Sequence, residues 1–373
     1  MPPILRRVLV LSHTYLQPAH RGKLRALAAR GLEVTVAIPQ RWREPWFGQP
    51  IDVAWERQGG LEVFPLPARG FGKGELAKIK YSYGALKALL RDRRPDLIQV
   101  EEEPTTPAAR QVFSAARRLG IPVVLFTHQN VDLQLDWWLS WKHRRMLRRL
   151  TGIIAGSDLA GTLARRDAPK LPIAVVPQLG ATAPHEPQHV PHEGLAIGFV
   201  GRLVPQKGID NLLQALALQR AAKWRLTIVG DGPDRERLER LATELRLAAR
   251  VRWTGGLPSE HVASLWPDLD VLVLPSRASH EWRETNGQVL MEAMAHEVAV
   301  LGTDSGVIPE LIGDAGIVVP DGDLEALGNA IATLSEPQSR RGLAQAARAR
   351  ALRLYSDDAI AERTLTFWQQ VVK

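Results

Sequence analysis

Residues 198–210 read GFVGRLVPQKGID and combine the end of a strand, a basic loop and the start of a helix. The apolar run Ala196–Val200 is typical of a strand covered on both faces of a parallel sheet. A helix that begins near Gly208 has free backbone N–H groups in its first turn, and these groups favour a phosphate. Arg202 and Lys207 add two cations at the same strand end. The stretch therefore predicts a strand–loop–helix unit that binds an anionic diphosphate, although a basic loop of this kind can also be purely structural.

Short apolar runs alternate with helical patterns along the whole chain. In the first half, the predicted strands are Arg7–Ser12, Glu33–Ile38, Leu97–Val100, Val123–Thr127 and Gly152–Ala155. The predicted helices there are Gly22–Arg30, Leu76–Arg91 and Ala108–Leu119. In the second half, strands are predicted at Ala196–Val200, Arg225–Val229, Val251–Trp253, Val271–Leu274, Val298–Leu301 and Gly316–Val318. Helices are predicted at Gly208–Gln219, Asp234–Leu247, Asn286–Ala295, Ile308–Leu311 and Leu324–Thr333.

This alternation predicts an α/β protein of two Rossmann-like, doubly wound domains that face a cleft where ligands bind. The stretch Gln178–Gly194 has three prolines, three histidines and no apolar periodicity, which is typical of a linker. We therefore expect a first domain over residues 1–180, a linker over 181–194 and a second domain over 195–356. A last helix over residues 357–373 is expected to pack back on the first domain.

The composition limits the function classes. The chain has no cysteine, which excludes disulfides and thiolate metal sites. No apolar run approaches the ~18 residues of a membrane-spanning helix, and Val8–Leu11 is too short for a signal peptide, so we expect a cytoplasmic protein. Residues 1–185 carry 28 Lys and Arg against 15 Asp and Glu, whereas residues 186–373 carry 20 against 25. This split indicates a first half that faces an anionic partner or surface.

A second informative stretch is Glu284–Ala295, which reads ETNGQVLMEAMA. Glu284 precedes the predicted helix, and Glu292 lies about two turns inside it. A carboxylate at such a position can accept hydrogen bonds from both hydroxyls of a ribose, although a lone Glu on a helix is more often simply solvated. The backbone amides of Asn286, Gly287 and Gln288 would face a diphosphate at the helix N-terminus.

Taken in order, the motifs GRL-x3-KG, VGDGP, a strand ending in PS, E-x7-E within EAMA, and GTDSG-x-IPE-x-IGDAG resemble a known family. They are similar to the nucleotide-binding domain of retaining glycosyltransferase family four, which has the GT-B fold. The resemblance is dense over Leu195–Asp323. The first half matches more loosely, through PDLIQVEEEP at Pro95–Pro104, which suggests the subgroup with EEEP in the first domain.

The resemblance implies roles for the matching residues. Arg202 and Lys207 would bind the donor diphosphate, next to Gly201, and would stabilise charge on the leaving phosphate. Glu292 would bind the ribose, and Glu284 would contact hydroxyls of the donor sugar. The remaining donor residues implied by the family are Trp253 and Leu257, at the strand end beside the base, with Asn286, Gly287 and Gln288.

Two residues of the first half complete the predicted site. His128, in LFTHQN, occupies the place where the family often has a histidine near the sugar and the acceptor, and a buried structural histidine is the alternative. Glu103 ends an acidic cluster that follows a predicted strand, so we expect it to bind acceptor hydroxyls. No general base is required if the leaving phosphate accepts the proton.

The sequence departs from the family pattern at several positions. Asn286 replaces the usual aromatic residue, and Glu297 and Ala299 replace a Gly and a Pro after EAMA. SHTYLQP at Ser12–Pro18 replaces the usual glycine-rich turn, and the loop His280–Arg283 is an insertion. The pair Asp268 and Asp270 resembles the metal-binding DxD of other transferases, but it precedes a buried strand far from the other motifs. We therefore expect no metal and no cofactor, with the two cations supplying the positive charge.

The stretch Asp136–Leu150 reads DWWLSWKHRRMLRRL and combines three tryptophans with five basic side chains. Trp and Arg at helical spacing suit a bilayer interface or an anionic, lipid-linked acceptor. The alternative is a helix packed on the sheet with its tryptophans inside and its arginines outside. Peripheral association with the inner face of a membrane is therefore a hypothesis.

The sequence thus predicts an enzyme: a metal-independent, retaining glycosyltransferase. It would move a hexose-type sugar from a nucleotide-diphosphate sugar to a glycan or lipid-linked acceptor, as in synthesis of a cell-envelope polysaccharide. A nucleotide-sugar epimerase of the same fold and an inactive, transferase-like binding protein remain alternatives. A nucleic-acid partner fits the pI of about 10.0 but not the acidic second half, and no nucleic-acid-binding motif occurs in the sequence.

Overall fold

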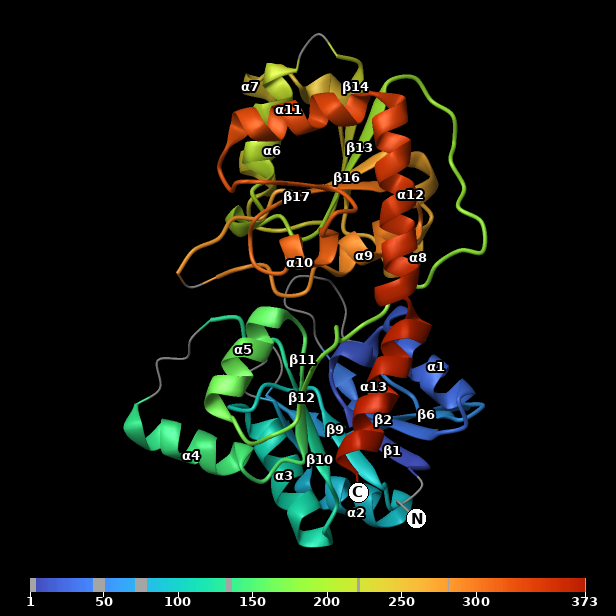
Figure 1. The fold of residues 1–373 in the computed structure, drawn as a ribbon, viewed down its shortest axis with the longest axis vertical. Helices are drawn as coiled ribbons and strands as arrows, with labels where there is room; N and C mark the ends of the chain where they lie inside the picture. The colour runs from blue at the N-terminus through green and yellow to red at the C-terminus, as the bar shows by residue number, and fades with distance from the viewer. Residues whose placement is uncertain are drawn as a thin grey trace. The chain divides into compact units, whose positions relative to one another are not determined.

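The computed structural model describes residues 5–42, 51–70, 79–131, 136–219, 222–280 and 282–372. The chain forms two compact units, drawn in Figure 1. Unit 1 comprises Met1–Gly180 together with the C-terminal segment Asp357–Lys373, and unit 2 comprises Ala181–Ser356. None of the helices in the described ranges is both long enough and apolar enough to cross a membrane.

Unit 1 contains an eight-stranded sheet with the order β12-β11-β10-β9-β1-β2-β6-β5. All neighbours pair in parallel except β5 and β6. The strands are β1 Arg7–Leu11, β2 Glu33–Pro39, β5 Glu56–Gln58, β6 Leu61–Leu66, β9 Leu97–Val100, β10 Val123–Thr127, β11 Gly152–Ala155 and β12 Ile173–Val175. Short two-residue pairings join β3 Arg41–Trp42 to β4 Ile51–Asp52, and β7 Ala68–Arg69 to β8 Lys80–Tyr81.

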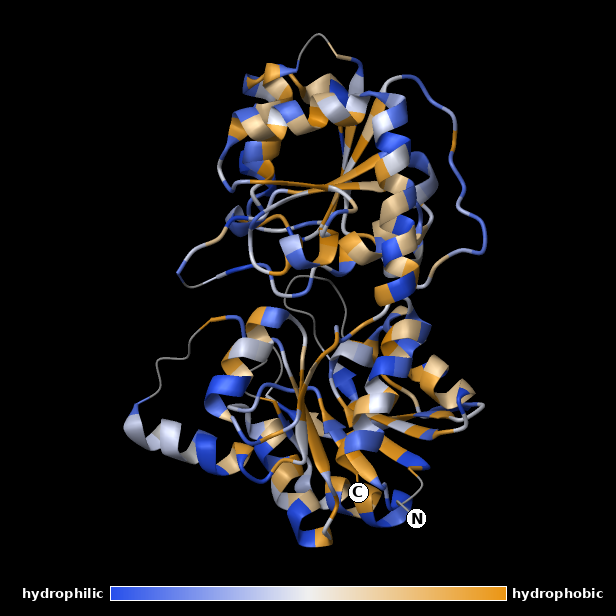
Figure 2. Cartoon of the chain, in the orientation of Figure 1, coloured by the Kyte–Doolittle hydropathy of each residue, from blue (hydrophilic) through white to orange (hydrophobic). Residues whose placement is uncertain are grey.

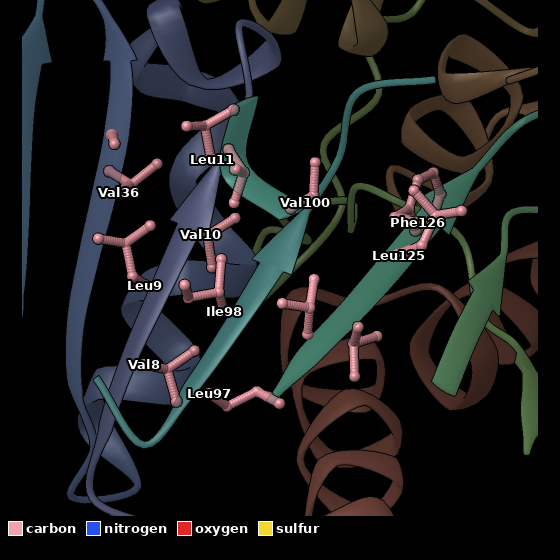
Figure 3. Packing of buried hydrophobic residues seen from close by; sticks show 14 of the residues in the cluster. Val8, Leu9, Val10, Leu11, Val36, Leu97, Ile98, Val100, Leu125 and Phe126 are labelled. Atoms are coloured by element: carbon pink, nitrogen blue, oxygen red, sulfur yellow. The ribbon is translucent and has the colours of Figure 1, made fainter. Parts of the chain in front are cut away.

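The central strands of this sheet are apolar on both faces, as expected for a parallel sheet covered by helices. Figure 3 shows buried hydrophobic side chains of β1, β9 and β10, together with Val36 on β2, that form part of the core. The helices of unit 1 are α1 Gly22–Ala29, α2 Tyr83–Arg93, α3 Pro107–Leu119, α4 Trp137–Leu147, α5 Asp158–Asp167 and α13 Asp357–Val371. Because α1 leads from β1 to β2 and α3 leads from β9 to β10 in the opposite direction, right-handed crossovers place them on opposite faces.

The C-terminal helix α13 is part of the unit 1 core. Trp368 is fully buried, and its indole N–H donates to Oε1 of Gln99 on β9 over 2.7 Å. Phe367 packs against β11, where a Cβ on Gly152 would lie 2.8 Å from the ring. The chain therefore returns to its first unit and closes one side of that sheet.

Unit 2 contains a six-stranded parallel sheet with the order β15-β14-β13-β16-β17-β18. Its strands are β13 Leu195–Val200, β14 Trp224–Val229, β15 Val251–Gly255, β16 Val271–Leu274, β17 Ala299–Thr303 and β18 Ile317–Val319. Its helices are α6 Ile209–Leu218, α7 Arg235–Glu244, α8 Ser259–Ala263, α9 Gln288–Ala295, α10 Ile308–Ile312, α11 Leu324–Ser335 and α12 Pro337–Leu354. Figure 2 shows that the strands are mainly hydrophobic, whereas the helices mix both classes of residue.

Each sheet reverses its direction of winding at one place. In unit 1 this switch point lies between β1 and β9, and in unit 2 it lies between β13 and β16. At a switch point the loops that follow neighbouring strands diverge to opposite faces and leave a crevice at the carboxyl ends of the strands. The topology therefore marks the loops after these four strands as the places where ligands bind.

The structure confirms the doubly wound α/β class and corrects several details of the prediction. The helix expected over Leu76–Arg91 begins only at Tyr83, because Lys80 and Tyr81 form a strand and the Ser82 hydroxyl caps the helix. Residues 76–78 of that prediction lie outside the described part of the chain. Strands β6 and β12 and the long helix α12 were not predicted.

The structure shows why the family usually has a Gly at the position of Glu297. Glu297 ends α9 with φ of 60°, in the left-handed region that glycine adopts without strain. Two backbone bonds enforce this conformation: its N–H donates to Met294 O, and Val298 N–H donates to Ala293 O. The carboxylate lies 4.0 Å from Arg348, a distance at which a pair contributes little.

We predict that Glu297→Gly raises the free energy of unfolding by about 1 kcal/mol, because the left-handed conformation is strained for a residue with a Cβ. Glu297→Ala is the matched control, since it removes the carboxylate but keeps the Cβ. Urea unfolding of the three proteins tests the prediction. Equal stability of the Gly and Ala variants would contradict it.

Candidate active site

The site of unit 2 forms where the loops after β13 and β16 meet. Gly208 lies in the left-handed region with φ of 63°, and a Cβ there would lie 2.0 Å from the carbonyl oxygen of Pro275. The Arg277 N–H donates to Gln206 O over 2.8 Å, which fastens the two loops together. The Arg277 side chain also donates to Asn211 at the start of α6. The basic loop is thus held against the end of β16. Only glycine fits at position 208, the last residue of this loop.

Lys207 and Glu284 form a shielded ion pair at this place. The Lys207 Nζ donates to Glu284 Oε2 over 2.5 Å, and the side chains are 13% and 6% exposed. The Ser276 hydroxyl donates to the same oxygen over 2.8 Å. The ammonium also lies 5.7 Å from the ring centre of Trp282, a residue of the inserted loop. Two residues 77 positions apart in sequence, both assigned to the donor site by the resemblance, therefore meet in an ion pair that the sequence analysis did not predict.

Burial alone would raise the pKa of Glu284, but the charged and hydrogen-bonding groups around the carboxylate lower it. The positive charge of Lys207 and the hydrogen bonds from Lys207, Ser276 and the Thr285 N–H together outweigh desolvation. The carboxylate is consequently ionised at neutral pH. It holds the lysine at the end of β16 before any ligand is bound.

The GTDSG motif of residues 302–306 positions Glu284 by its backbone. A Cβ on Gly306, which has φ of 58°, would lie 2.0 Å from the carbonyl oxygen of Glu284. That same carbonyl accepts the Val307 N–H over 3.0 Å. The buried Ser305 hydroxyl donates to Arg277 O over 2.9 Å. The glycine and serine of this motif are therefore explained by the close approach of two backbones.

The other predicted donor residues lie in the loop after β13, at α9 and near the end of β15. Arg202 is exposed in the loop after β13, and Gly201 makes the close contact with Gly230 that shapes this loop. Glu292 lies on α9 and accepts from the Gln288 amide, four residues earlier, over 3.2 Å. The remaining predicted residues have these positions: Gly287 caps α9 with φ of 54°, Asn286 precedes it, and the partly buried Trp253 and Leu257 pack against the unit 2 core.

Unit 1 has its own cluster at the switch point, built around the acidic motif after β9. Glu101 is buried, and its Oε1 accepts from Lys23 over 2.9 Å, from Gln99 over 2.6 Å and from Tyr15 over 3.1 Å. Glu102 accepts from both the backbone N–H and the ring Nδ1 of His13. These two carboxylates therefore fix the segment Ser12–Pro18, which stands in place of a glycine-rich turn.

The hydrogen-bond network determines the tautomer of His128. Gln178 must direct its amide nitrogen at Glu101 Oε2, over 2.9 Å, because a carboxylate only accepts. Its carbonyl oxygen then faces His128 Nε2 at 2.9 Å, so this ring nitrogen carries the proton. Nδ1 is left buried without a hydrogen-bond partner among the described residues, packed against Gly156, where a Cβ would come within 2.6 Å.

Both ring nitrogens of His128 thus face the protein. Burial lowers the pKa of the ring more than the Gln178 hydrogen bond raises it, so the imidazole is neutral at pH 7. This geometry fits the structural alternative for His128 better than a catalytic role. In this arrangement, the ring fixes Gln178 at the switch point of unit 1.

Glu103 is the last residue of the acidic motif that follows β9, and its hydrogen bonds link this motif to the end of β10. Its carboxylate accepts from the Thr127 hydroxyl and from the His128 N–H, each over 3.0 Å. Burial is the largest influence on its pKa, which is raised despite these two hydrogen bonds. Glu103 and His128, which the sequence analysis assigned separately to the predicted site, are therefore neighbours.

Sequence reasoning missed Gln178, which it assigned to the start of a linker. Gln178 is buried and bonds to Thr14, Glu101 and His128. Its place just after the apolar run at β12 was the available signal. Lys23 was missed as well, because nothing in a helical sequence pattern distinguishes a buried lysine from a solvated one.

Asp268 and Asp270, the DxD-like pair, precede β16 and lie at the amino ends of the unit 2 strands, opposite to Lys207. Asp270 immediately precedes β16 and accepts the Ala196 N–H, near the start of β13, over 2.8 Å. Its carboxylate also pairs with Arg340 and His192, each over 3.3 Å. We therefore assign it a structural role. Over the described ranges, no group of three or more His, Asp or Glu is arranged to hold a metal ion.

We predict that Lys207→Met destabilises the protein by about 3 kcal/mol at pH 7, because it leaves the buried Glu284 carboxylate unpaired. In the wild type the pKa of Glu284 lies below 4.5, so its contribution is present above pH 4.5 and is lost as the pH falls through the lowered pKa. In the variant, burial raises that pKa, so the penalty fades as the pH falls. The stability difference should narrow by about 1 kcal/mol or more between pH 7 and pH 4.5.

Urea unfolding at the two pH values measures this difference. Lys223→Met is the matched control, because Lys223 is 74% exposed and pairs with an exposed Glu193. The control should change stability by less than about 0.5 kcal/mol at either pH. A stability difference for Lys207→Met that does not depend on pH would show that Glu284 is not held ionised by Lys207.

Known families match both units of the chain. Residues 18–178 match the family model described as glycosyl transferase 4-like domain, and residues 183–350 match that of glycosyl transferases group 1. Alpha-D-kanosaminyltransferase of Streptomyces kanamyceticus is 26% identical over 94% of this chain and 98% of its own length. The GDP-mannose-dependent alpha-mannosyltransferase of Mycobacterium tuberculosis is 28% identical over 79% of this chain and 78% of its own.

A solved structure shares the fold across the whole chain. The Anabaena protein Alr3699/HepE, in complex with UDP-glucose, has a TM-score of 0.69 at 19% identity and covers 98% of this chain and 99% of its own. The two units, their parallel sheets and the two family matches agree with one another. The chain is therefore a glycosyltransferase with the GT-B fold, formed from a 4-like unit and a group 1 unit.

Proposed function

We propose that this glycosyltransferase moves a hexose-type sugar from a nucleotide-diphosphate sugar to a hydroxyl of a glycan or lipid-linked acceptor, with retention and without a metal. The shielded Lys207–Glu284 pair at the unit 2 switch point carries the proposal. It combines a fixed cation with a carboxylate at the carboxyl ends of parallel strands, where such sheets bind nucleotides.

In the proposed donor site, Lys207 and the exposed Arg202 bind the diphosphate, together with the N–H groups at the start of α9. Lys207 can turn from Glu284 toward a phosphate because its side chain is not fully enclosed. Glu292 then binds the ribose, Trp253 and Leu257 lie beside the base, and Glu284 contacts the sugar. The relatives use different bases, since one name states GDP-mannose and one structure contains UDP-glucose.

In this proposal, Arg202 and Lys207 supply the positive charge at the diphosphate that a metal ion would otherwise supply. Charge develops on the diphosphate as the bond to the sugar breaks, and preorganised positive groups stabilise it most in a shielded site. The acceptor hydroxyl passes its proton to the leaving phosphate, so unit 1 has to bind the acceptor without a dedicated base. Glu103 serves this binding with the oxygen lone pairs that Thr127 and His128 leave available.

The surface of α4 supports a peripheral attachment to an anionic membrane. Trp137 is 81% exposed, Trp138 48% and Trp141 49%, which contradicts the alternative in which these side chains pack on the sheet. Arg144 and Arg145 follow on the same helix. Exposed tryptophans beside arginines suit the boundary between lipid headgroups and acyl chains.

We predict that one nucleotide-diphosphate sugar of a uridine and guanosine panel stabilises the protein in a thermal-shift assay, equally with and without EDTA. Glu292→Gln should weaken binding of that donor about 10-fold, because it removes an ionised hydrogen-bond acceptor from the ribose. Arg202→Ala should lower kcat about 100-fold or more. Its matched control is Arg240→Ala, an equally charged and exposed residue on α7.

Nuclear magnetic resonance of the product then reports the anomeric configuration, which should match that of the donor. Conversion of the donor without any acceptor would instead support an epimerase. Stabilisation that disappears with EDTA, or equal losses in Arg202→Ala and Arg240→Ala, would reject the proposed site.

We also predict that vesicles with 30 mol% phosphatidylglycerol co-sediment the protein at low salt, whereas pure phosphatidylcholine vesicles retain far less. The double variant Trp137→Ser and Trp138→Ser should lose most of this binding. Trp55→Ser is the control, because Trp55 is 55% exposed but lies outside α4. Absence of binding to the anionic vesicles would reject the attachment.

A further inference from the structure

A groove of about 1080 Å³ lies in unit 1 between α3 and α4. Its walls come from α3, from the segment around the start of β10, and from α4 with the turn after it. Pro104 and Thr105, which directly follow Glu103 in the chain, also line the groove. The groove belongs entirely to unit 1, and none of the interactions described for the donor site uses it.

Positive charge dominates the polar part of this groove. Three arginines come from α3 and two from the α4 side: Arg110, Arg117, Arg118, Arg145 and Arg149. No carboxylate is among the lining residues, and none of the five guanidinium groups forms an ion pair with any residue that the structure describes. Arg118 lies over the ring of Tyr83 and Arg145 over that of Trp141, contacts that leave their charge uncompensated.

The arginines on the two walls repel one another. The pKa of Arg149 is lowered, chiefly by the charge of Arg117 on the facing helix, then by desolvation and by the charge of Arg145. A bound anion with two or more charges would relieve this repulsion and would accept several charge-assisted hydrogen bonds. The cluster is therefore better suited to a phosphate or diphosphate than to a single neutral hydroxyl.

Much of the remaining lining is apolar. Phe113, Met146, Ile121 and Val123 contribute side chains from both walls. Met is flexible and adapts to irregular chains, and the partly exposed Phe113 gives a flat contact surface. His143 also lines the groove, and its ring Nδ1 is buried with no hydrogen-bond partner in the described part of the chain. Such a nitrogen is available to a polar atom of a ligand.

We propose that this groove binds a phosphate-bearing amphiphile, with the arginines on the phosphate and the apolar side chains along its hydrocarbon chain. This proposal rests on the proposed function for one point only, namely that the amphiphile is the lipid anchor of the acceptor. Because Pro104 and Thr105 follow Glu103 directly, an acceptor sugar joined to the phosphate would extend toward the residue proposed to bind it. The exposed tryptophans of α4 would keep the groove at the membrane surface that supplies such a ligand.

Isothermal titration calorimetry with three probes tests the two parts of the groove. Farnesyl diphosphate has both a diphosphate and an apolar chain, inorganic pyrophosphate has only the anion, and farnesol has only the chain. Farnesyl diphosphate should bind at least about 10-fold more tightly than pyrophosphate, because burial of only a few methylene groups provides that factor. Farnesol should bind more weakly than both.

The double variant Arg117→Gln and Arg149→Gln locates the binding. It should weaken farnesyl diphosphate at least about 10-fold, because each lost guanidinium removes charge-assisted hydrogen bonds. The matched control is Arg144→Gln with Arg148→Gln, which removes the same charge from exposed positions of the same segment that do not line the groove. The control should stay within about 2-fold of the wild type.

Equal losses in the two double variants would show that only general electrostatic attraction is at work, and would overturn the proposal. Pyrophosphate that binds as tightly as farnesyl diphosphate would overturn the assignment of the apolar chain. Circular dichroism of all variants confirms that they fold. Donor binding by unit 2 is measured separately by thermal shift, so a protein that binds no nucleotide sugar but passes the groove test rejects the proposed function alone.

Discussion

The ion pair between Lys207 and Glu284 is the interaction on which the architecture of unit 2 depends. An ionised carboxylate that is 6% exposed is unfavourable unless its charge is compensated, so the fold must bring a cation and further donors to it. Gly208 lets the basic loop approach the end of β16, Gly306 lets the GTDSG backbone pass over Glu284, and Ser276 donates to the same carboxylate. These motifs are therefore parts of one arrangement that holds a lysine at the strand ends.

Unit 1 also has a buried carboxylate at its switch point, but a different set of groups compensates its charge. Its switch point also contains a Lys–Glu pair, Lys23 with Glu101, but both side chains are at most 2% exposed. There Tyr15, Gln99 and Gln178 complete the hydrogen bonds of the carboxylate, and the network goes on to fix the tautomer of His128. The enclosed pair of unit 1 shapes a loop, whereas Lys207 of unit 2 is 13% exposed, as its proposed role of binding a phosphate requires.

Much of the fold could be predicted from the sequence, because strands buried on both faces are short, continuous apolar runs; β9, β10, β11 and β16 begin and end where predicted. Strand β6 was missed because Pro65 and Glu62 interrupt its apolar run. The family motifs, and not periodicity, assigned both Lys207 and Glu284 to the predicted donor site, but they did not predict the ion pair between them. Gln178 and Lys23 could not be recognised, since their roles depend on tertiary hydrogen bonds between segments that are distant in sequence. The groove of unit 1 depends on how α4 lies against α3, which no local pattern specifies.

A crystal structure with the nucleoside diphosphate of the preferred donor bound would test most directly whether Lys207 binds the diphosphate. We predict a phosphate oxygen within about 3 Å of Lys207 Nζ, with Glu284 still accepting the Ser276 hydroxyl and Arg202 turned toward the same diphosphate. A diphosphate bound elsewhere on unit 2, with Lys207 paired only to Glu284, would contradict it. In that case the pair would have a purely structural role, as Lys23 and Glu101 have in unit 1.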